Sequence, residues 1–323
     1  MLELTRNVAE RARTALGITL QNLAVQDVIA LSFHAYIFLR ITIAPDSPDA
    51  TVARRLALAL FVVTACCMVL SRGEVIRKRP ARALVYRLGL FVPMVLSYFE
   101  MRVLLPALQR DLMDGRLFAI DEWLLGTTPA VWMGAWNTQP VVEWFSFFYY
   151  THFFVLVIML LPALFFGKGR RLQELMAGGM LVIATGHFLY TLVPGVGPYA
   201  TLAFDEPLYG GFWWRQVEVT VATAGAQLDI FPSLHTAWPA YFTLHAFAHR
   251  DVAPFKVLWP ILGFIAVNIV IATMFLRWHW FIDVVLGVLL AFGARRFAVA
   301  VASREAERGG PYDGRQAVWE PLL

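Results

Sequence analysis

The chain has 323 residues, of which 59% are hydrophobic and only 15% are charged, whereas an ordinary soluble domain has about 25% charged residues. This composition excludes a soluble globular protein and indicates an integral membrane protein. The two cysteines, Cys66 and Cys67, are adjacent in an apolar run, so neither a disulfide framework nor a cysteine-rich metal site is available.

Hydropathy predicts an all-α, polytopic transmembrane bundle of about eight spans, because about 20 apolar residues are needed to cross a bilayer as a helix. The segment before the first span is polar and charged, with no apolar core followed by a cleavage site, so we predict no removable signal peptide. The sixth span is short and crosses only if it is extended at either end. The predicted spans are 28–45, 56–71, 85–105, 144–166, 175–193, 235–248, 257–276 and 281–300.

Lysine and arginine gather in alternate connections, which predicts the orientation of the chain. These basic residues lie in the N-terminal segment, in 72–82, in 168–171, in 250–256 and after 294. All of these segments fall on one side of the membrane, so we expect both termini in the cytoplasm. The net charge of +4 then reflects the orientation of the chain in the membrane, and we do not expect nucleic-acid binding.

The spans divide the chain into three parts. Residues 1–84 hold two accessory spans, and residues 85–303 hold the other six spans as the catalytic domain. Residues 304–323 form a polar tail that we expect to be disordered. The connections 194–232 and 277–280 are predicted to lie outside, where they would join spans five to six and seven to eight.

Two short polar motifs stand at the outer ends of the sixth and eighth spans, FPSLH at 231–235 and HWFID at 279–283. Ionisable groups at membrane depth are costly and are functional-site candidates. Both spans run inward, so their N-termini bring backbone N–H groups and the positive end of the helix dipole to the outer face, where an anion can bind. His279 and Asp283 are four residues apart and share a helix face. The carboxylate can therefore hold one imidazole nitrogen while the other faces a phosphate.

These motifs resemble those of the type 2 phosphatidic acid phosphatase superfamily, which has a Pro-Ser…His cluster followed by His-x-x-x-Asp. The resemblance covers about residues 121–300 and implies a six-helix catalytic core. It implies that His279 is the nucleophile that forms a phosphohistidine and that Asp283 orients it. It further implies that His235 is the general acid and Ser233 a phosphate ligand. No metal or other cofactor is implied, and the rival to exclude is a zinc site built from the two histidines and Asp283.

The chain departs from this family at the cations that hold phosphate. Tyr190 stands where the first motif of the family has lysine, Gly197-Pro198 replaces its Arg-Pro, and Thr273 replaces the arginine of its third motif. Arg277, two residues before the nucleophilic histidine, is expected to supply a substitute cation. The further residues expected to contact the substrate are Tyr190, Gly197, Pro198 and Tyr199.

Two longer runs, ATMFLRWHWFID at 272–283 and IDEWLLGTTPAVWM at 120–133, are similar to the branch that contains fungal inositol phosphorylceramide synthase and its bacterial relatives. This resemblance implies a phosphotransferase of a bacterial plasma membrane that passes a phospho-headgroup between lipids of the outer leaflet. The expected partners are these lipids and the bilayer, and no oligomeric state is predicted. Two alternatives stay open: a lipid phosphate or polyprenyl pyrophosphate phosphatase that releases inorganic phosphate, and a non-catalytic lipid-binding membrane protein.

Other polar residues near the predicted site are expected to have structural roles. His152 and His187 lie inside spans, where hydrogen-bonded core histidines are the simpler interpretation. Asp229, four residues before Ser233, is expected to shape the outer loop.

Overall fold

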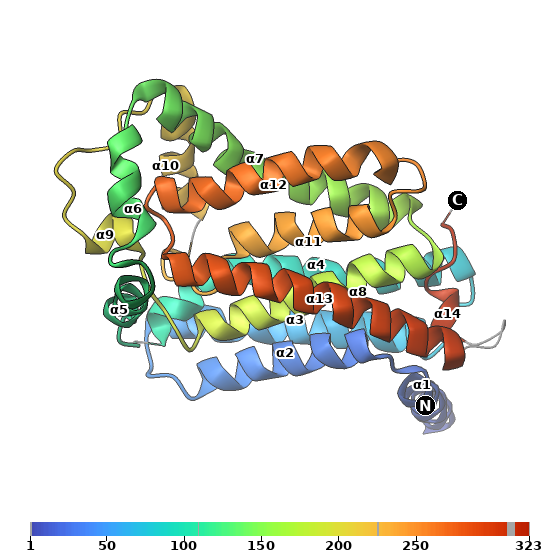
Figure 1. The fold of residues 1–323 in the computed structure, drawn as a ribbon. Coiled ribbons are helices and arrows are strands. Elements are labelled where there is room, and N and C mark those ends of the chain that lie inside the picture. The colour runs from blue at the N-terminus through green and yellow to red at the C-terminus, as the bar shows by residue number, and fades with distance from the viewer. Residues whose placement is uncertain (1, 109, 225, 309–313, 323) are drawn as a thin grey trace.

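The computed structural model describes residues 2–108, 110–224, 226–308 and 314–322. Within these ranges the chain contains helices and no strand, which confirms the all-α prediction. Eight long helices run side by side (Figure 1) and correspond one for one to the predicted spans. They are α2 (Val25–Thr42), α3 (Pro48–Arg72), α4 (Arg79–Ala107), α7 (Gln139–Phe166), α8 (Gly169–Tyr190), α11 (Leu234–Ala248), α12 (Phe255–Phe275) and α13 (Phe281–Arg308).

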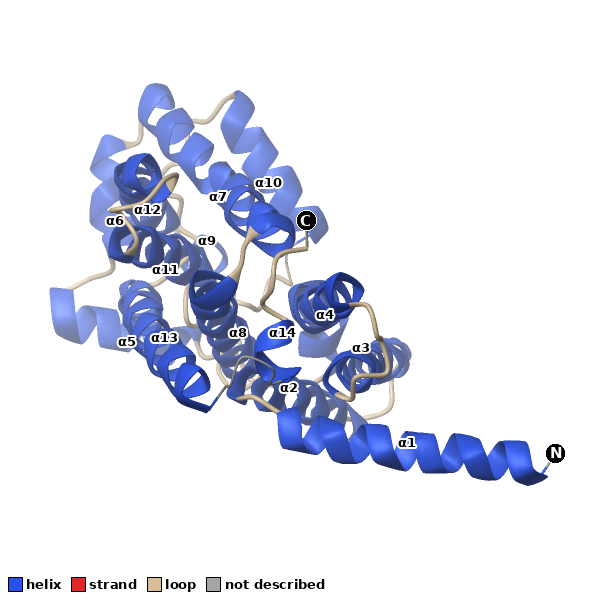
Figure 2. Ribbon diagram, turned by 90° about the vertical axis from the view of Figure 1, so that its right-hand side faces the viewer, coloured by secondary structure: helices blue, strands red, loops and turns tan. Residues whose placement is uncertain are grey.

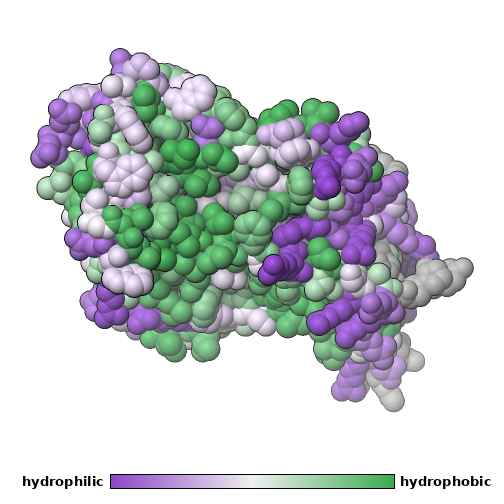
Figure 3. Space-filling model, in the orientation of Figure 1, coloured by the Kyte–Doolittle hydropathy of each residue, from purple (hydrophilic) through white to green (hydrophobic). Residues whose placement is uncertain are grey.

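The lengths of the helices and the apolar surface of the bundle are those of a membrane protein. Among the described residues, six helices are long and apolar enough to cross a bilayer, and a seventh span results if α2 is counted with the preceding helix as one bent span. Helix α11 has only 15 residues, as expected for the short sixth span. On the face shown in Figure 3, apolar side chains form a belt between two more polar ends. The protein is an integral membrane protein.

Local sequence explains several helix ends. Ser47 caps α3 by accepting the backbone N–H of Ala50 at 3.0 Å, and Pro48 occupies the first turn. Ser233 caps α11 in the same way, by accepting the N–H of Thr236 at 3.3 Å. Helix α5 (Asp114–Leu125) ends at Gly126, whose φ of +78° is a conformation that favours glycine.

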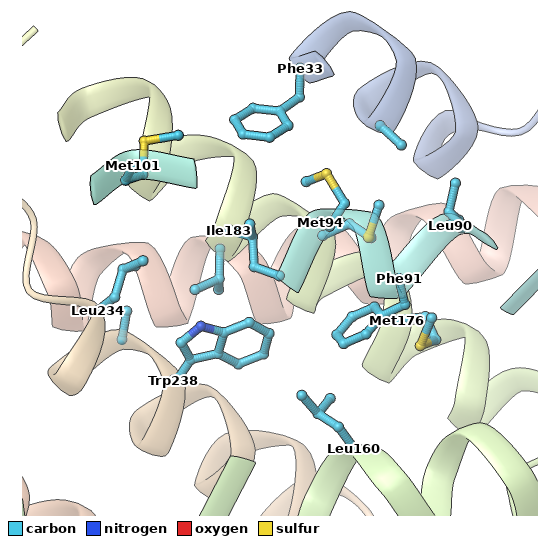
Figure 4. Close-up of a cluster of buried hydrophobic side chains, with 14 of the residues drawn as sticks. Phe33, Leu90, Phe91, Met94, Met101, Leu160, Met176, Ile183, Leu234 and Trp238 are labelled. Carbon is cyan, nitrogen blue, oxygen red and sulfur yellow. The ribbon is translucent and has the colours of Figure 1, made fainter. Parts of the chain in front are cut away.

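Side chains from α2, α4, α7, α8 and α11 meet in one buried apolar cluster (Figure 4). Small residues allow the close approach of α8 and α11. A Cβ added to Gly178 would lie 2.1 Å from the hydroxyl of Tyr241, and one added to Gly179 would lie 3.0 Å from the Trp238 ring. Such close packing matters in a bilayer, where lipid tails are as apolar as the side chains and van der Waals contact drives helix association.

The two ends of the bundle differ in their connections. Helices α5, α6 (Pro129–Trp132), α9 (Pro198–Thr201) and α10 (Phe212–Ala224) gather at one end, on the left in Figure 1. Helices α1 (Leu2–Asn22) and α14 (Gly314–Ala317) lie at the other end. Figure 2 shows α1 extending sideways from the bundle, and its described part makes an angle of 112° with α2. Both polar motifs lie at the end that carries α5 and α10.

The C-terminal tail is more ordered than its composition predicts. Helix α13 continues to Arg308, and Val318 and Trp319 are buried. The Trp319 ring packs edge-on against Tyr86 at 5.4 Å, and Arg87 donates a hydrogen bond to the Val318 carbonyl at 3.1 Å. Apolar side chains of the tail thus pack it against α4. Residues 309–313 lie outside the described part of the chain.

Candidate active site

The turn between α12 and α13 brings His279 to Asp283. The imidazole Nδ1 lies 3.4 Å from Asp283 Oδ2, and both side chains are buried. The same carboxylate oxygen accepts the backbone N–H of Trp280 at 2.9 Å, which fixes its position. Because Nδ1 faces the carboxylate, Nε2 remains as the nitrogen that can react with a substrate.

His235 lies in the first turn of α11 and faces the same region. Its ring centroid is 6.0 Å from that of His279. The ring stacks on Tyr149 of α7 at 4.5 Å, with an angle of 17° between the planes. Its Nε2 is buried and has no hydrogen-bond partner among the described residues. This nitrogen is therefore available for proton transfer to or from a bound group.

A cavity of about 390 Å³ adjoins the two histidines. Its walls come from α4, α7, α10 and the outer loops, and they are rich in aromatic rings. Asp229 and Glu218 also line the cavity, whereas none of its described lining residues is lysine or arginine. The cavity therefore offers carboxylates where a phosphate site usually offers cations.

Burial and charge set the protonation of the groups at this cavity. Burial lowers the pKa of His279 to about 4, and the Asp229 carboxylate opposes that shift. Burial raises the pKa of Asp229, an effect that His279 and the hydroxyl of Tyr98 partly offset. At neutral pH the imidazole of His279 is neutral, which is the state a nucleophile needs.

The backbone N–H groups at the start of α13 are occupied by a carboxylate of α5. Phe281 and Ile282 donate their N–H groups to Asp121 at 2.8 and 3.0 Å. The sequence predicted that these groups would be free to bind an anion, and that prediction was wrong. The partner could not be read from the motif, because Asp121 precedes it by about 160 residues.

Ser233, one of the predicted substrate-binding residues, is the N-cap of α11. The side chain is fully buried, and its hydroxyl is engaged with the Thr236 N–H. Its backbone N–H donates to the Asp283 carbonyl at 3.0 Å. Ser233 thus ties the two histidine motifs together, and it is not among the residues that line the cavity.

The segment PGVGPY at 194–199 reaches the cavity through Val196 and Tyr199. Gly197 has φ of +81°, and a Cβ there would lie 2.2 Å from the Trp278 carbonyl oxygen, so the close approach requires glycine. Pro198 is buried in the first turn of α9. Tyr199 stacks on Trp278 at 4.8 Å and lines the cavity. Gly197 and Pro198 therefore shape the loop that presents Tyr199.

Arg277 points to the outer loop. Its guanidinium lies 3.8 Å above the centre of the Phe204 ring, and it donates a hydrogen bond to the Glu206 carbonyl at 3.0 Å. It is not among the cavity-lining residues. The structure therefore does not bring the expected substitute cation to the two histidines.

A second cavity of about 390 Å³ lies between α4, α7, α8 and α11 and is mostly apolar. Asp229 and His235 line both cavities, so the two are adjacent. Tyr190, His152 and His187 line the second cavity. We predicted structural roles for His152 and His187, but the His152 ring centroid is 4.4 Å from that of His235.

One group in the described part of the chain has the spacing of a metal site, at the opposite end of the bundle. It comprises Glu174, His245 and His249. The Glu174 carboxylate already accepts hydrogen bonds from Arg170 at 2.9 Å and Arg295 at 2.7 Å. Two arginines beside the carboxylate disfavour a further cation, so this group is better explained as a polar link between α8, α11 and α13.

Comparison with known proteins supports the interpretation of the histidine motifs. A family profile for the PAP2 superfamily matches residues 115–297, more than half of the chain. The match includes α5, both histidine motifs and the outer loops. Neither the search of curated proteins nor the search of solved structures gave a match. PAP2 members are usually phosphatases or phosphotransferases, which supports a lipid enzyme of one of these types. The chain belongs to the PAP2 superfamily.

Proposed function

We propose that this protein transfers a phospho-headgroup from a phospholipid to the hydroxyl of a second lipid, through a phosphohistidine on His279. The charge of the cavity carries the proposal. Asp229 and Glu218 line it without a lysine or arginine among the described lining residues. A phosphomonoester approaches two negative charges at neutral pH, whereas the phosphodiester of a phospholipid has one. The anionic cavity therefore favours a phosphodiester donor over the substrate of a phosphatase.

In the first step the neutral Nε2 of His279 attacks phosphorus, and the bond between phosphorus and the diacylglycerol oxygen breaks. Asp283 holds Nδ1 and stabilises the positive charge that develops on the ring. His235 takes up a proton as the negatively charged donor phosphate binds beside it, and it gives that proton to the leaving oxygen. The products of this step are diacylglycerol and a headgroup phosphohistidine.

In the second step an acceptor hydroxyl attacks the phosphohistidine. His235, now neutral, takes the hydroxyl proton, the bond between phosphorus and Nε2 breaks, and His279 is restored. The apolar cavity beside His235 suits a hydrocarbon chain of the acceptor. An acceptor held there has a large effective concentration, so water competes poorly.

The test uses purified protein in lipid nanodiscs with donor phospholipids labelled in the headgroup and a panel of lipid alcohols. We expect a new labelled phospholipid and diacylglycerol in equal amounts, little inorganic phosphate, and neither product with His279→Ala. Release of phosphate from phosphatidic acid or a polyprenyl pyrophosphate, with no acceptor modified, would identify a phosphatase instead. Lipid binding without turnover of any substrate would identify a non-catalytic lipid-binding protein.

A further inference from the structure

The cavity beside the two histidines combines aromatic rings with carboxylates. Its aromatic lining comprises Tyr98, Tyr149, Tyr150, Phe153, Tyr199 and Trp278. Asp229 is half-buried in the loop before α11, and Glu218 is exposed on α10. Neither carboxylate is part of the nucleophile and acid pair, so the chemistry of phosphoryl transfer does not explain them.

The rings form a continuous wall from the exposed loop to His235. Tyr199, which is 46% exposed, stacks on Trp278 with centroids 4.8 Å apart. Trp278 lies 6.4 Å from Tyr149, and Tyr149 stacks on His235 at 4.5 Å. These rings and His279 line the same cavity, so a headgroup bound there contacts this wall.

No lysine or arginine among the described lining residues offsets the charge of the two carboxylates, and Arg277 is directed to Phe204. Burial raises the pKa of Asp229 because it disfavours the charged form of this carboxyl. A cation bound beside Asp229 would stabilise that charged form. An ammonium group over an aromatic face gains a further attraction of about 0.5–2 kcal/mol.

We infer that this cavity binds the ammonium group of an amino-alcohol headgroup, so that the donor is a phospholipid of the phosphoethanolamine or phosphocholine type. The inference rests on the proposed headgroup transfer and names its donor. The phosphate lies at His279, and the ammonium group, two carbons beyond, faces Asp229 and the aromatic wall. Asp229 and His279 line the same cavity, as this placement requires.

Net charge separates this headgroup from a polyol headgroup. The phosphodiester of an amino alcohol is a zwitterion with no net charge, so it enters the anionic cavity without net repulsion. An inositol or glycerol phosphodiester keeps its negative charge, and the described lining offers it no lysine or arginine. Hydroxyl groups could donate hydrogen bonds to Asp229, but they leave the cavity charge uncompensated.

The binding test uses full-length His279→Ala protein, which cannot form a phosphohistidine, in detergent micelles. Titration calorimetry with phosphocholine, phosphoethanolamine, inositol 1-phosphate and glycerol 3-phosphate gives the affinities. We expect the two amino-alcohol phosphates to bind about tenfold more tightly than the other two. Adding Asp229→Asn is expected to weaken phosphocholine binding by about tenfold and not to weaken the binding of inositol 1-phosphate. Asp205→Asn, an exposed carboxylate of the same outer loop that does not line the cavity, is the matched control.

A parallel assay of wild-type protein compares phosphatidylcholine, phosphatidylethanolamine and phosphatidylinositol as donors. Headgroup transfer together with equal or tighter binding of inositol 1-phosphate would overturn the ammonium site and leave the transferase intact. Asp229-dependent phosphocholine binding without any transfer would keep the ammonium site and reject the transferase. Should Asp229→Asn fail to fold, the selectivity of the His279→Ala protein for phosphocholine over inositol 1-phosphate still decides the inference.

Discussion

As the proposed nucleophile, His279 has two requirements to meet. It must be unprotonated to attack phosphorus, and it must keep one orientation. Burial achieves the first, since it lowers the pKa to about 4. Asp283 achieves the second, because its carboxylate faces Nδ1 and is itself held by the Trp280 N–H. The imidazole is thus neutral and oriented at the edge of the cavity that it lines.

Substitution of the two histidines is expected to separate their roles. His279→Ala should abolish turnover and any acid-labile phosphoenzyme. His235→Ala should slow the release of an alkoxide by about 10² to 10⁴, the usual contribution of a positioned general acid. A donor with a nitrophenolate leaving group needs no proton and should restore His235→Ala alone. A phosphoenzyme that persists in His279→Ala would assign the nucleophile to another residue.

The pH dependence of phosphoenzyme formation follows from the pKa of His279. The folded pKa of about 4 lies below the usual value of 6.5, so the imidazole stays neutral, and reactive, until the pH falls towards 4. With a nitrophenolate donor, the single-turnover rate is expected to be constant from pH 8 to about 5 and to fall below that. Asp229→Asn removes a charge that raises this pKa, so the fall should move to lower pH. An acid limb near pH 6.5 would contradict the buried neutral histidine.

The sequence predicted the pairing of His279 with Asp283 because their spacing is local. An i, i+4 pair at a helix start shares a face whatever the rest of the fold does. The place of Asp229 in the cavity could not be predicted, for the opposite reason. Its position four residues before Ser233 was visible, but the direction of a loop side chain depends on α4 and α10, which line the cavity with it.

At the scale of elements, α5 organises the site without contributing a reactive group. Asp114 and Asp121 lie seven residues apart, about two helical turns, and both are buried. Asp114 accepts the Gly197 N–H at 2.8 Å and the Trp280 indole N–H at 3.0 Å. Asp121 accepts two N–H groups of α13 and the Thr128 hydroxyl. Helix α5 therefore fixes the position of the loop that contains Tyr199 relative to the turn that contains His279.

Loss of the Asp121 carboxylate should destabilise this arrangement. Asp121→Ala leaves the N–H groups of Phe281 and Ile282 unpaired, which is expected to cost about 1–3 kcal/mol for each group left unsatisfied. A lower thermal unfolding midpoint and reduced kcat are expected, measured on purified protein in detergent. Glu122→Gln, the exposed neighbour on the same helix, is the control and should behave as wild type. Equal midpoints for Asp121→Ala and wild type would show that α5 does not hold α13.

Hydropathy predicted the long helices but not α5, α9 or α10. A bilayer requires a minimum length and an apolar composition of a helix that spans it. A helix in an outer loop is under neither requirement. The IDEWLL run was noted as a resemblance only. Asp121 in this run contacts a residue 160 positions away, and Asp114 before it contacts one 83 positions away. No local pattern contains such contacts.

At the scale of the whole molecule, the reactive groups lie at one end of the bundle and most basic residues at the other. The second connection includes exposed Arg77 and Lys78, next to the end that carries α1 and α14 in Figure 1. The loop with Asp205 lies at the end with α5 and α10. If basic connections stay in the cytoplasm, His279 faces the outer leaflet and takes its lipids from there.

Cysteine labelling tests this orientation. In a background with Cys66→Ala and Cys67→Ala, single cysteines are introduced as Asp205→Cys and Lys78→Cys, both at exposed positions. An impermeant maleimide added to intact bacterial cells should label Asp205→Cys, because the outer loop is predicted to face the medium. Lys78→Cys should react only after the cells are permeabilised, since the positive-inside rule retains its basic neighbours in the cytoplasm. The reverse pattern would place His279 and its lipid substrates at the cytoplasmic leaflet.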